Sequence, residues 1–111
     1  MINFKIKPFN KLNTSELYQI LSLRNEVFIV EQNCVYQDID HKDQKAHHVI
    51  GYFDDEMVCY ARIFKPNDYL EKASIGRVIV NPKFRKRDFG NSLVKTSIEA
   101  IESIFGESQI E

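Results

Sequence analysis

The segment Ile75–Leu93 reads IGRVIVNPKFRKRDFGNSL, and it decides the fold of this chain. Its first part ends in the β-branched run 78–80, which predicts a strand that is buried on both faces. Asn81 and Pro82 close that strand, and helical spacing of apolar residues begins near Phe89. A strand, a basic loop and a helix are therefore expected one after another in this single segment.

The loop inside the segment concentrates positive charge. Four of the five residues from 83 to 87 are basic: Lys83, Arg85, Lys86 and Arg87. The N-terminus of a helix presents unpaired backbone N–H groups and a partial positive charge, so basic side chains beside it favour a phosphate site. One interpretation is a cradle for a pyrophosphate, and the alternative is a solvated basic turn. The glycine spacing and the Lys-Ser/Thr pair of a Walker A loop are absent.

Short runs predict the strands elsewhere in the chain. The run 2–6 alternates apolar and polar residues, and the runs 46–53 and 57–64 are strand-like, as is the run 73–80 that leads into the basic loop. The polar turn 54–56 joins two of these runs, which predicts an antiparallel hairpin.

Helical patterns precede and follow these strands. Asn13, with Glu16 three residues later, predicts a capped helix from about Thr14 to about Val30, with a break near Asn25. A second helix is predicted from Phe89 to Phe105, followed by Gly106 as a C-terminal cap. Its predicted buried stripe comprises Val94, Ile98, Ile101 and Phe105, with Leu93 and Ile104 beside it. The order β–α–β–β–β–α–(β) indicates one α/β or α+β domain.

Composition narrows the class of protein further. The chain has 111 residues, 43% hydrophobic and 28% charged, which is typical of one globular domain. Its net charge of −1 gives no general attraction to nucleic acid or to an anionic membrane. The N-terminus lacks an apolar core, no run approaches the roughly 20 apolar residues of a membrane span, and Cys34 and Cys59 are too few for a disulfide scaffold. We therefore expect a cytoplasmic protein with free thiols.

The strand, loop and helix resemble motif A of the GNAT acetyltransferases, whose loop reads Arg/Gln-x-x-Gly-x-Gly/Ala. Residues 85–90 of this chain read RKRDFG. The stretches LRNEVFIVEQNCVYQDIDHKD (23–43), AHHVIG (46–51) and IGRVIVNP (75–82) resemble the ElaA-like group within that superfamily. The resemblance implies a central mixed β-sheet flanked by helices, splayed open beside the motif A strand, with acetyl-CoA in the splay.

The same resemblance implies which residues hold the cofactor. Backbone groups of Val78, Ile79 and Val80 would contact its pantetheine arm. The pyrophosphate would lie on Arg85, Lys86, Arg87, Asp88, Phe89, Gly90 and Asn91. Asp88 stands where the family has its first glycine, and its carboxylate would repel a pyrophosphate. We therefore expect weaker cofactor binding than the family pattern gives.

The resemblance also implies an activity, namely direct transfer of an acetyl group from acetyl-CoA to a primary amine of a small molecule or peptide. The family fold continues beyond Glu111 with the rest of a fifth strand, a helix and a hairpin, so the fold would be truncated after the motif A helix. An open sheet edge would then remain, which predicts a homodimer through that edge. The alternative function is a catalytically weak or inactive GNAT-like binding module that acts through this edge.

Three residues are candidates for the general base. Glu31 closes the first helical region and would hold an ammonium group or pass its proton to water. His47 and His48 begin a strand, so they face opposite sides, and each is either a base near pH 7 or a hydrogen-bonded structural histidine. Arg77 lies beside the expected cleft, where it either binds an acidic acceptor or pairs with a nearby carboxylate.

The polar segment 33–45 collects acidic residues and histidine. Its part DIDHKD (38–43) has the Asp-x-Asp spacing of a calcium loop, but the glycine and the distal glutamate of such a loop are absent. A solvated acidic loop is the alternative interpretation, and the family resemblance makes it a loop that shapes the acceptor side. We expect no metal, and the lack of interleaved basic and aromatic residues indicates no nucleic-acid partner.

Overall fold

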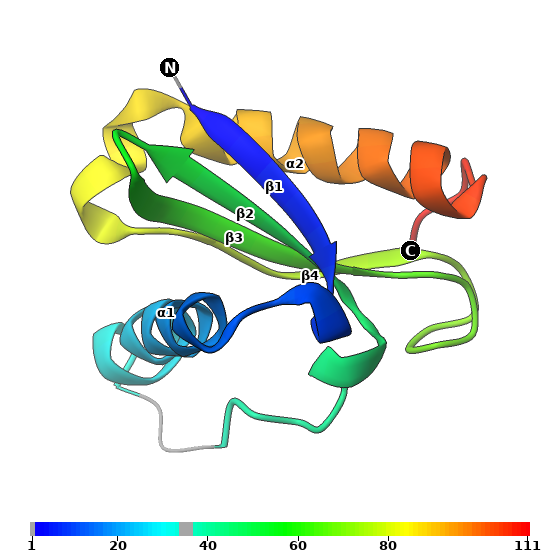
Figure 1. Cartoon of the computed structure of the whole chain (residues 1–111), viewed down its shortest axis with the longest axis horizontal. Helices are drawn as coiled ribbons and strands as arrows, with labels where there is room; N and C mark the ends of the chain where they lie inside the picture. The colour runs from blue at the N-terminus through cyan, green and yellow to red at the C-terminus, as the bar shows by residue number, and fades with distance from the viewer. Residues whose placement is uncertain (1, 34–36) are drawn as a thin grey trace.

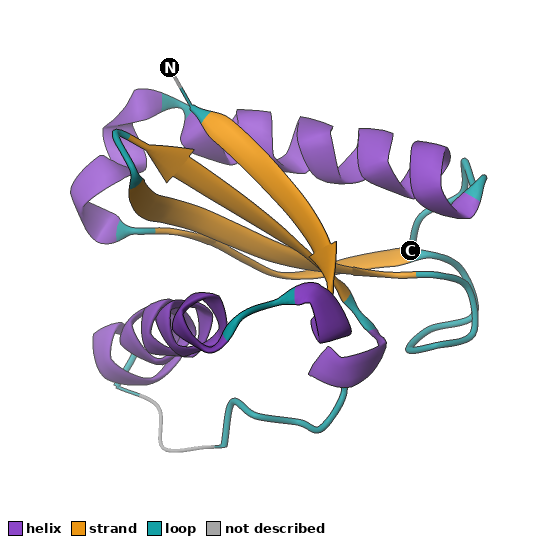
Figure 2. Ribbon diagram, viewed as in Figure 1, coloured by secondary structure: helices purple, strands orange, loops and turns teal. Residues whose placement is uncertain are grey.

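The computed structural model describes residues 2–33 and 37–111, so Cys34 lies outside the described residues. Four strands form one sheet: β1 (Asn3–Pro8), β2 (His47–Phe53), β3 (Glu56–Phe64) and β4 (Ser74–Val80). Two helices, α1 (Thr14–Asn25) and α2 (Phe89–Ala100), each continue into a π-helical turn, η2 (Glu26–Glu31) and η5 (Ile101–Phe105). Three 3-10 turns, η1 (Phe9–Lys11), η3 (Asp43–Lys45) and η4 (Pro82–Arg87), complete the α+β fold (Figure 2).

The sheet is an antiparallel meander in the order β1-β2-β3-β4. The predicted hairpin is confirmed, because Phe53 pairs with Glu56 across the turn between β2 and β3. Asp54 and Asp55 both have positive φ angles, 51° and 66°, as a tight hairpin turn that follows the twist of the strands requires. The parallel part of the predicted mixed sheet is a single bridge between Ala73 and Ile110.

One helix packs on each face of the sheet (Figure 1). Helix α2 covers the face that carries Val49, Val58, Cys59, Ala61 and Ile63. Helix α1 and η2 cover the other face, where Ile20, Leu23 and Val27 pack against Ile50, Met57, Tyr60 and Ile79. No helix in the described part of the chain is long and apolar enough to cross a bilayer.

The start of α1 is fixed by the predicted capping box. The Asn13 side chain accepts a hydrogen bond from the Glu16 backbone N–H at 2.7 Å, and the Glu16 carboxylate accepts one from the Asn13 N–H at 2.9 Å. The same carboxylate pairs with Lys7 Nζ at 2.7 Å, which ties α1 to β1. The predicted break near Asn25 is also confirmed, since the helix changes to the π-helical turn η2 after this residue.

The predicted stripe of α2 is partly wrong. Val94 and Ile98 are 39% and 37% exposed, whereas Leu93, Ser97 and Ile101 are fully buried. Ser97 fits this face because its hydroxyl donates a hydrogen bond to the Leu93 carbonyl oxygen at 2.8 Å. A polar side chain therefore occupies a position that hydrophobic periodicity alone assigns to an apolar one.

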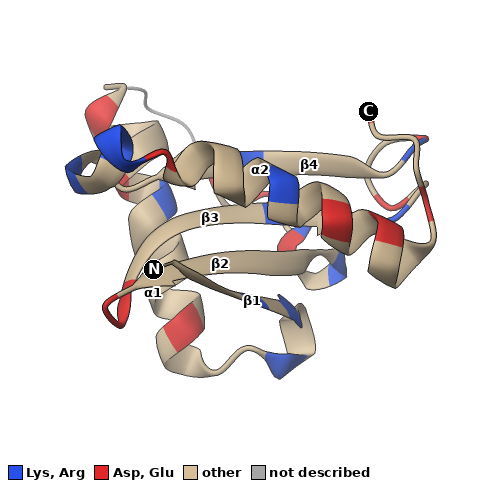
Figure 3. Cartoon of the chain, turned by 90° about the horizontal axis from the view of Figure 1, so that it is seen from above, with Lys and Arg blue, Asp and Glu red and all other residues tan. Residues whose placement is uncertain are grey.

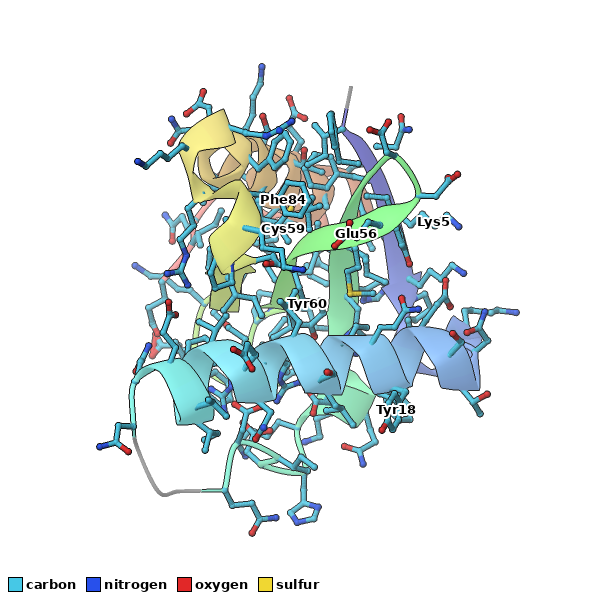
Figure 4. The ribbon with its side chains drawn as sticks, turned by 90° about the vertical axis from the view of Figure 1, so that its left-hand side faces the viewer. Lys5, Tyr18, Glu56, Cys59, Tyr60 and Phe84 are labelled. Atoms are coloured by element: carbon cyan, nitrogen blue, oxygen red, sulfur yellow. The ribbon has the colours of Figure 1, made fainter. Side chains whose placement is uncertain are left out.

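Successive residues of β3 serve the two separate faces. Cys59 points toward the α2 side with Phe84, and Tyr60 points toward α1 (Figure 4). Cys59 is fully buried, and a side chain at its β2 neighbour Gly51 would collide with its sulfur and with the Phe4 ring. Burial raises the pKa of the Cys59 thiol to about 12, so this thiol stays protonated at neutral pH.

Candidate functional site

The outer edge of β4 is open over most of its length. On its inner edge β4 pairs with β3, but among the described residues the outer edge meets only the bridge at Ala73, where the Glu111 N–H donates to the Ala73 oxygen at 2.8 Å. The prediction that the run 78–80 is buried on both faces is wrong at Val78, which is 41% exposed, while Ile79 is buried. The backbone predicted to bind pantetheine therefore lies on an accessible strand edge.

A bulge interrupts β4 beside this edge. The register with β3 shifts between Tyr60 and Arg62, because β4 carries one extra residue there. Arg77 absorbs the extra residue with a left-handed backbone, at a φ of 51°. Bulges of this kind bend a strand and are frequent beside active sites, where they change the direction of backbone groups.

The basic loop follows β4 as η4, and its four cations divide into two kinds. Arg85 donates to the Val80 carbonyl oxygen at 3.2 Å and pairs with a carboxylate, and the Arg87 guanidinium lies 5.2 Å from the centre of the Phe53 ring. Lys83 and Lys86 are exposed and have no ion-pair partner among residues 2–33 and 37–111. Arg87 is also exposed and has no ion-pair partner within the described residues, so the charges accessible to an anion at the N-terminal end of α2 are those of Lys83, Lys86 and Arg87. Figure 3 shows basic residues gathered in the loop before α2.

Asp88 connects this loop to α2 in a left-handed conformation, with a φ of 62°. This geometry explains why the family pattern has glycine there, since glycine adopts positive φ without steric cost. The Asp88 carboxylate accepts a hydrogen bond from the Asn91 side chain at 2.6 Å and makes no cap to the backbone of α2. The first N–H groups of α2, from Phe89 onward, are therefore not capped by this side chain, which suits an anion site.

Glu31, a candidate base, is paired with the basic loop. Its two carboxylate oxygens each accept a hydrogen bond from Arg85, both at 2.7 Å. The hydrogen bonds from Arg85 lower the pKa of Glu31 below its ordinary value, which makes this carboxylate a weaker base. The structure thus brings together two predicted site residues, but as partners of each other.

The two histidines face opposite sides of β2, as predicted. His47 lies on the α2 side with its ring 5.2 Å from the Phe105 ring, and burial lowers the pKa of His47. His48 is fully buried, and its Nε2 lies 3.0 Å from the Asp43 carbonyl oxygen. A carbonyl can only accept, so His48 Nε2 donates and its Nδ1 accepts from the Tyr60 hydroxyl.

Of the two roles considered for His48, a base near pH 7 or a hydrogen-bonded structural histidine, this arrangement fits the structural one. Burial lowers the pKa of His48, so its neutral form predominates at pH 7. Strand β3 separates both histidines from β4. Two strand spacings amount to about 9–10 Å. The histidine backbones are therefore well removed from the open edge.

The acidic segment 38–43 is fastened by arginines from three elements. Arg24 of α1 and Arg62 of β3 are 0% and 1% exposed, and both donate to Asp43 Oδ1, at 2.7 and 2.9 Å. Although burial disfavours the charged form, the hydrogen bond to Asp43 raises the pKa of Arg24 above its ordinary value. Both guanidinium groups therefore remain charged inside the protein.

Arg77 completes this network from β4. Its Nε donates to Asp38 Oδ1 at 2.8 Å, while Asp38 Oδ2 accepts from Arg24 Nε at 2.8 Å. Arg62 binds Asp40 through both terminal nitrogens, and this pairing holds the pKa of Asp40 well below its usual range. Arg77 was expected either to bind an acidic acceptor or to pair with a nearby carboxylate, and in the structure it pairs with a carboxylate. The acidic segment is a set of internal counter-ions.

Arg24 and Arg62 were not predicted as members of a network, although each carries a signal in the sequence. Arg62 is the one charged residue of the run 57–64, and Arg24 falls on the buried face of α1 beside Leu23. A charged residue at a core position needs a buried counter-ion. The partners are 14 to 22 residues away in the chain, so the pairing itself could not be predicted.

A hollow of about 520 Å³ lies between α1 and the turn that joins β2 to β3. Tyr18 and Glu26 line one side, and Glu56 and Met57 line the other; Figure 4 shows Tyr18 and Glu56. Asn81 is its one residue from the segment that carries the predicted cofactor site. The hollow is thus separate from the outer edge of β4.

The fold and the site together point to one family of proteins. Their shared features are a meander sheet with one helix on each face, a bulged strand with an open edge, and a basic loop before a helix. The acetyltransferase (GNAT) family matches residues 14–108, and the chain belongs to this family. Within it, the chain is 45% identical over 101 residues to protein ElaA of Escherichia coli, covering 89% of this chain. The chain spans 66% of the length of ElaA.

Solved structures agree with this assignment. The crystal structure of Escherichia coli ElaA superposes with a TM-score of 0.91, covering 99% of this chain and 76% of that one at 40% identity. An acyl-CoA N-acyltransferase from Pseudomonas aeruginosa has a TM-score of 0.92 at 30% identity, with coverages of 99% and 77%. A predicted acetyltransferase from Clostridium acetobutylicum, solved with acetyl-CoA, shares the fold at a TM-score of 0.69 and 16% identity, with coverages of 100% and 79%.

Proposed function

We propose that the chain binds acetyl-CoA along the outer edge of β4 and transfers its acetyl group to a primary amine of a small molecule or peptide. The observation that carries the proposal is the continuity of the site: an open strand edge leads through a basic loop into the first turn of α2, which Asp88 leaves without a side-chain cap. Membership of the GNAT family and the acetyl-CoA in the Clostridium acetobutylicum structure support it.

The chain's own residues fit such a ligand in two ways. Within the described residues, backbone groups on the outer edge of β4 around Val78 have no strand partner, so they can form hydrogen bonds with an extended amide-containing arm, as with an added strand. Lys83 and Lys86 provide accessible positive charge beside the N–H groups at the start of α2, where phosphate oxygens are stabilised. Bound acetyl-CoA would supply a thioester carbonyl. The amine nitrogen would form a bond to its carbonyl carbon as the carbon–sulfur bond breaks, and the sulfur would leave as the thiol with a proton from the amine.

The mechanism that these residues support relies mainly on position. The bulge at Arg77 redirects backbone groups of β4, and a backbone N–H there would polarise the reacting carbonyl. Glu31 is engaged by Arg85 and His48 is buried, so we assign the removal of the ammonium proton to water at the open edge.

Calorimetric titration of the folded protein with acetyl-CoA and with CoA, at moderate and high salt, tests the cofactor site. We expect saturable binding at one site that weakens as salt rises, because the lysines and helix N–H groups attract phosphate electrostatically. Release of free thiol in the presence of a panel of primary amines then tests transfer. Absence of heat from a chain shown to be folded would overturn the proposal.

A second candidate function, association with another copy of the chain, has its own observation. Val78, Val94 and Ile98, which we call the apolar strip, are 41%, 39% and 37% exposed. The strip borders β4, because Gly90 on the same flank of α2 lies against Val80, and a Cβ atom at Gly90 would be only 3.7 Å from the Val80 side chain. An apolar strip beside an open strand edge favours antiparallel pairing of two β4 strands.

Sedimentation over a range of concentrations tests this second candidate. We expect a dimer that dissociates when Ile98→Lys introduces a charge into the apolar strip. Glu99→Lys, at the exposed neighbouring position, is the matched control and should leave the dimer intact. A chain that stays monomeric at every concentration would exclude this function.

A further inference from the structure

An ion pair connects the end of the first helical region to the basic loop, across 54 residues of sequence. Arg85 Nη1 and Nη2 contact the two oxygens of the Glu31 carboxylate, each at 2.7 Å. This is the parallel two-bond geometry that gives an arginine–carboxylate pair its specificity. Because Glu31 ends η2 and Arg85 lies in η4, the pair holds two separate elements at a fixed distance.

A third contact fixes the same guanidinium to β4. Arg85 Nε donates to the Val80 carbonyl oxygen at 3.2 Å. Arginine has five N–H donors in one rigid plane. All three nitrogens of Arg85 thus already contact protein oxygens, and the group joins the end of β4, the loop and η2. Lys83 and Lys86 in the same loop have no such contacts among the described residues.

We propose that Glu31 and Arg85 are positioning residues, a clasp that sets the shape of the cofactor loop, and that neither acts as the base or as a phosphate ligand. The inference rests on the proposed function for its ligand, acetyl-CoA. The clasp holds η4 against η2, so that the N–H groups at the start of α2 keep one arrangement beside the outer edge of β4. The lowered pKa of Glu31 agrees with this role, since a base needs a proton affinity near the working pH.

The two possible roles of Arg85, phosphate ligand and clasp, predict opposite changes in CoA affinity for the substitution Glu31→Gln. If Arg85 were a phosphate ligand held back by Glu31, then Glu31→Gln would free the guanidinium and strengthen binding of CoA. If the two residues form a clasp, Glu31→Gln loosens the loop and weakens binding. A clasp further requires that the double variant binds no more weakly than Arg85→Gln alone, because Arg85→Gln already removes the interaction with Glu31.

The experiment measures CoA affinity by calorimetry for the wild-type chain and these three variants. We expect Glu31→Gln to bind about five-fold more weakly, the size of one exposed two-bond ion pair, and the two variants that lack Arg85 to bind at least as weakly. Glu26→Gln is the matched control, because it removes a carboxylate from the same turn η2 and should leave the affinity unchanged. Arg85→Lys should not restore binding, since a single ammonium cannot hold both Glu31 and the Val80 oxygen.

Hydrogen exchange of the ligand-free chain tests the clasp without the cofactor. We expect Glu31→Gln and Arg85→Gln to speed exchange of the backbone amides over 82–91, and Glu26→Gln to leave them as in wild type. Stronger CoA binding by Glu31→Gln, or unchanged exchange in this loop, would overturn the clasp. A wild-type chain that binds no CoA but shows faster loop exchange in Glu31→Gln would instead overturn the proposed function and keep the clasp.

Discussion

Two regions of this molecule are rich in charge, and they use it in opposite ways. In the acidic segment 38–43, three aspartates are matched by three arginines, and Arg24 and Arg62 are buried with them. In the basic loop, the charges are exposed, and Lys83 and Lys86 have no ionic partner in the described part of the chain. A buried and matched charge network thus fastens the acidic segment to the fold, whereas the exposed lysines of the basic loop have no counter-ion among the described residues, and we propose that they serve a ligand.

The largest effect is expected from Arg24→Met, which breaks the buried region. Loss of the guanidinium leaves Asp38 and Asp43 with less compensation in a buried environment. Removing one partner of a buried ion pair costs about 3–5 kcal/mol. Urea unfolding measures the free energy, and Arg85→Gln in the exposed region is the control, with an expected loss below about 1 kcal/mol. Equal losses for the two variants would contradict the contrast between the regions.

Acid should destabilise the buried region in two steps. The native state disfavours protonated His48, so stability is full above the unfolded pKa of about 6.5 and falls as the pH drops below it. The native pKa of Asp40 is depressed, so its contribution is lost below the unfolded value of about 3.9. Melting temperatures from pH 8 to pH 3 measure both steps.

Two variants separate the histidine step from other acid effects. His48→Gln should reduce the loss that begins near pH 6.5, to which His47 also contributes because burial lowers its pKa, whereas the exposed His41→Gln should keep the loss unchanged. A melting temperature in the wild type that stays constant between pH 7 and pH 5 would show that buried His48 contributes nothing to the pH dependence.

Asp88→Gly tests the cost of the departure from the family pattern in the basic loop. Glycine relieves the left-handed backbone at this position, which should stabilise the fold by about 0.5–1 kcal/mol. It also removes a carboxylate next to the start of α2, so CoA binding should tighten. Asp88→Asn is the control that removes only the charge: it should tighten binding without the gain in unfolding free energy.

The smallest effect is expected from Lys86→Gln. This exposed lysine has no ion-pair partner in residues 2–33 and 37–111, so the free energy of unfolding should not change. CoA binding should weaken by about two- to three-fold, mostly at low salt. Lys95→Gln, an exposed lysine further along α2, is the control and should bind as the wild type does. Equal affinity of Lys86→Gln and wild type would remove Lys86 from the cofactor site.

Local sequence patterns predicted the helix start and the hairpin because the interactions that form them act between residues close together in the chain. The capping residues Asn13 and Glu16 and the polar turn 54–56 act over a few residues, and both were placed correctly. Val78 could not be placed in the same way. A β-branched run has the same composition whether its strand is covered on both sides or lies at an open sheet edge, and only the arrangement of the other strands decides.

The site was predicted less completely for a similar reason. Sequence placed Arg85 and Glu31 in one functional region but not as partners, since 54 residues separate them. The left-handed conformation at Asp88 could be expected from the family glycine, and the structure has it. The arginine network depends on which side chains the folded sheet brings together, so no spacing rule could find it.

Cys59 packs against Gly51 in the core, so the reactivity of its thiol reports on local opening of the folded protein. A buried and protonated sulfur reacts with an alkylating reagent only when the packing around it opens. In a Cys34→Ser background, Cys59 is the one remaining thiol of the sequence. Its alkylation rate would then measure how often the core between the sheet and α2 opens in the native protein, without denaturant.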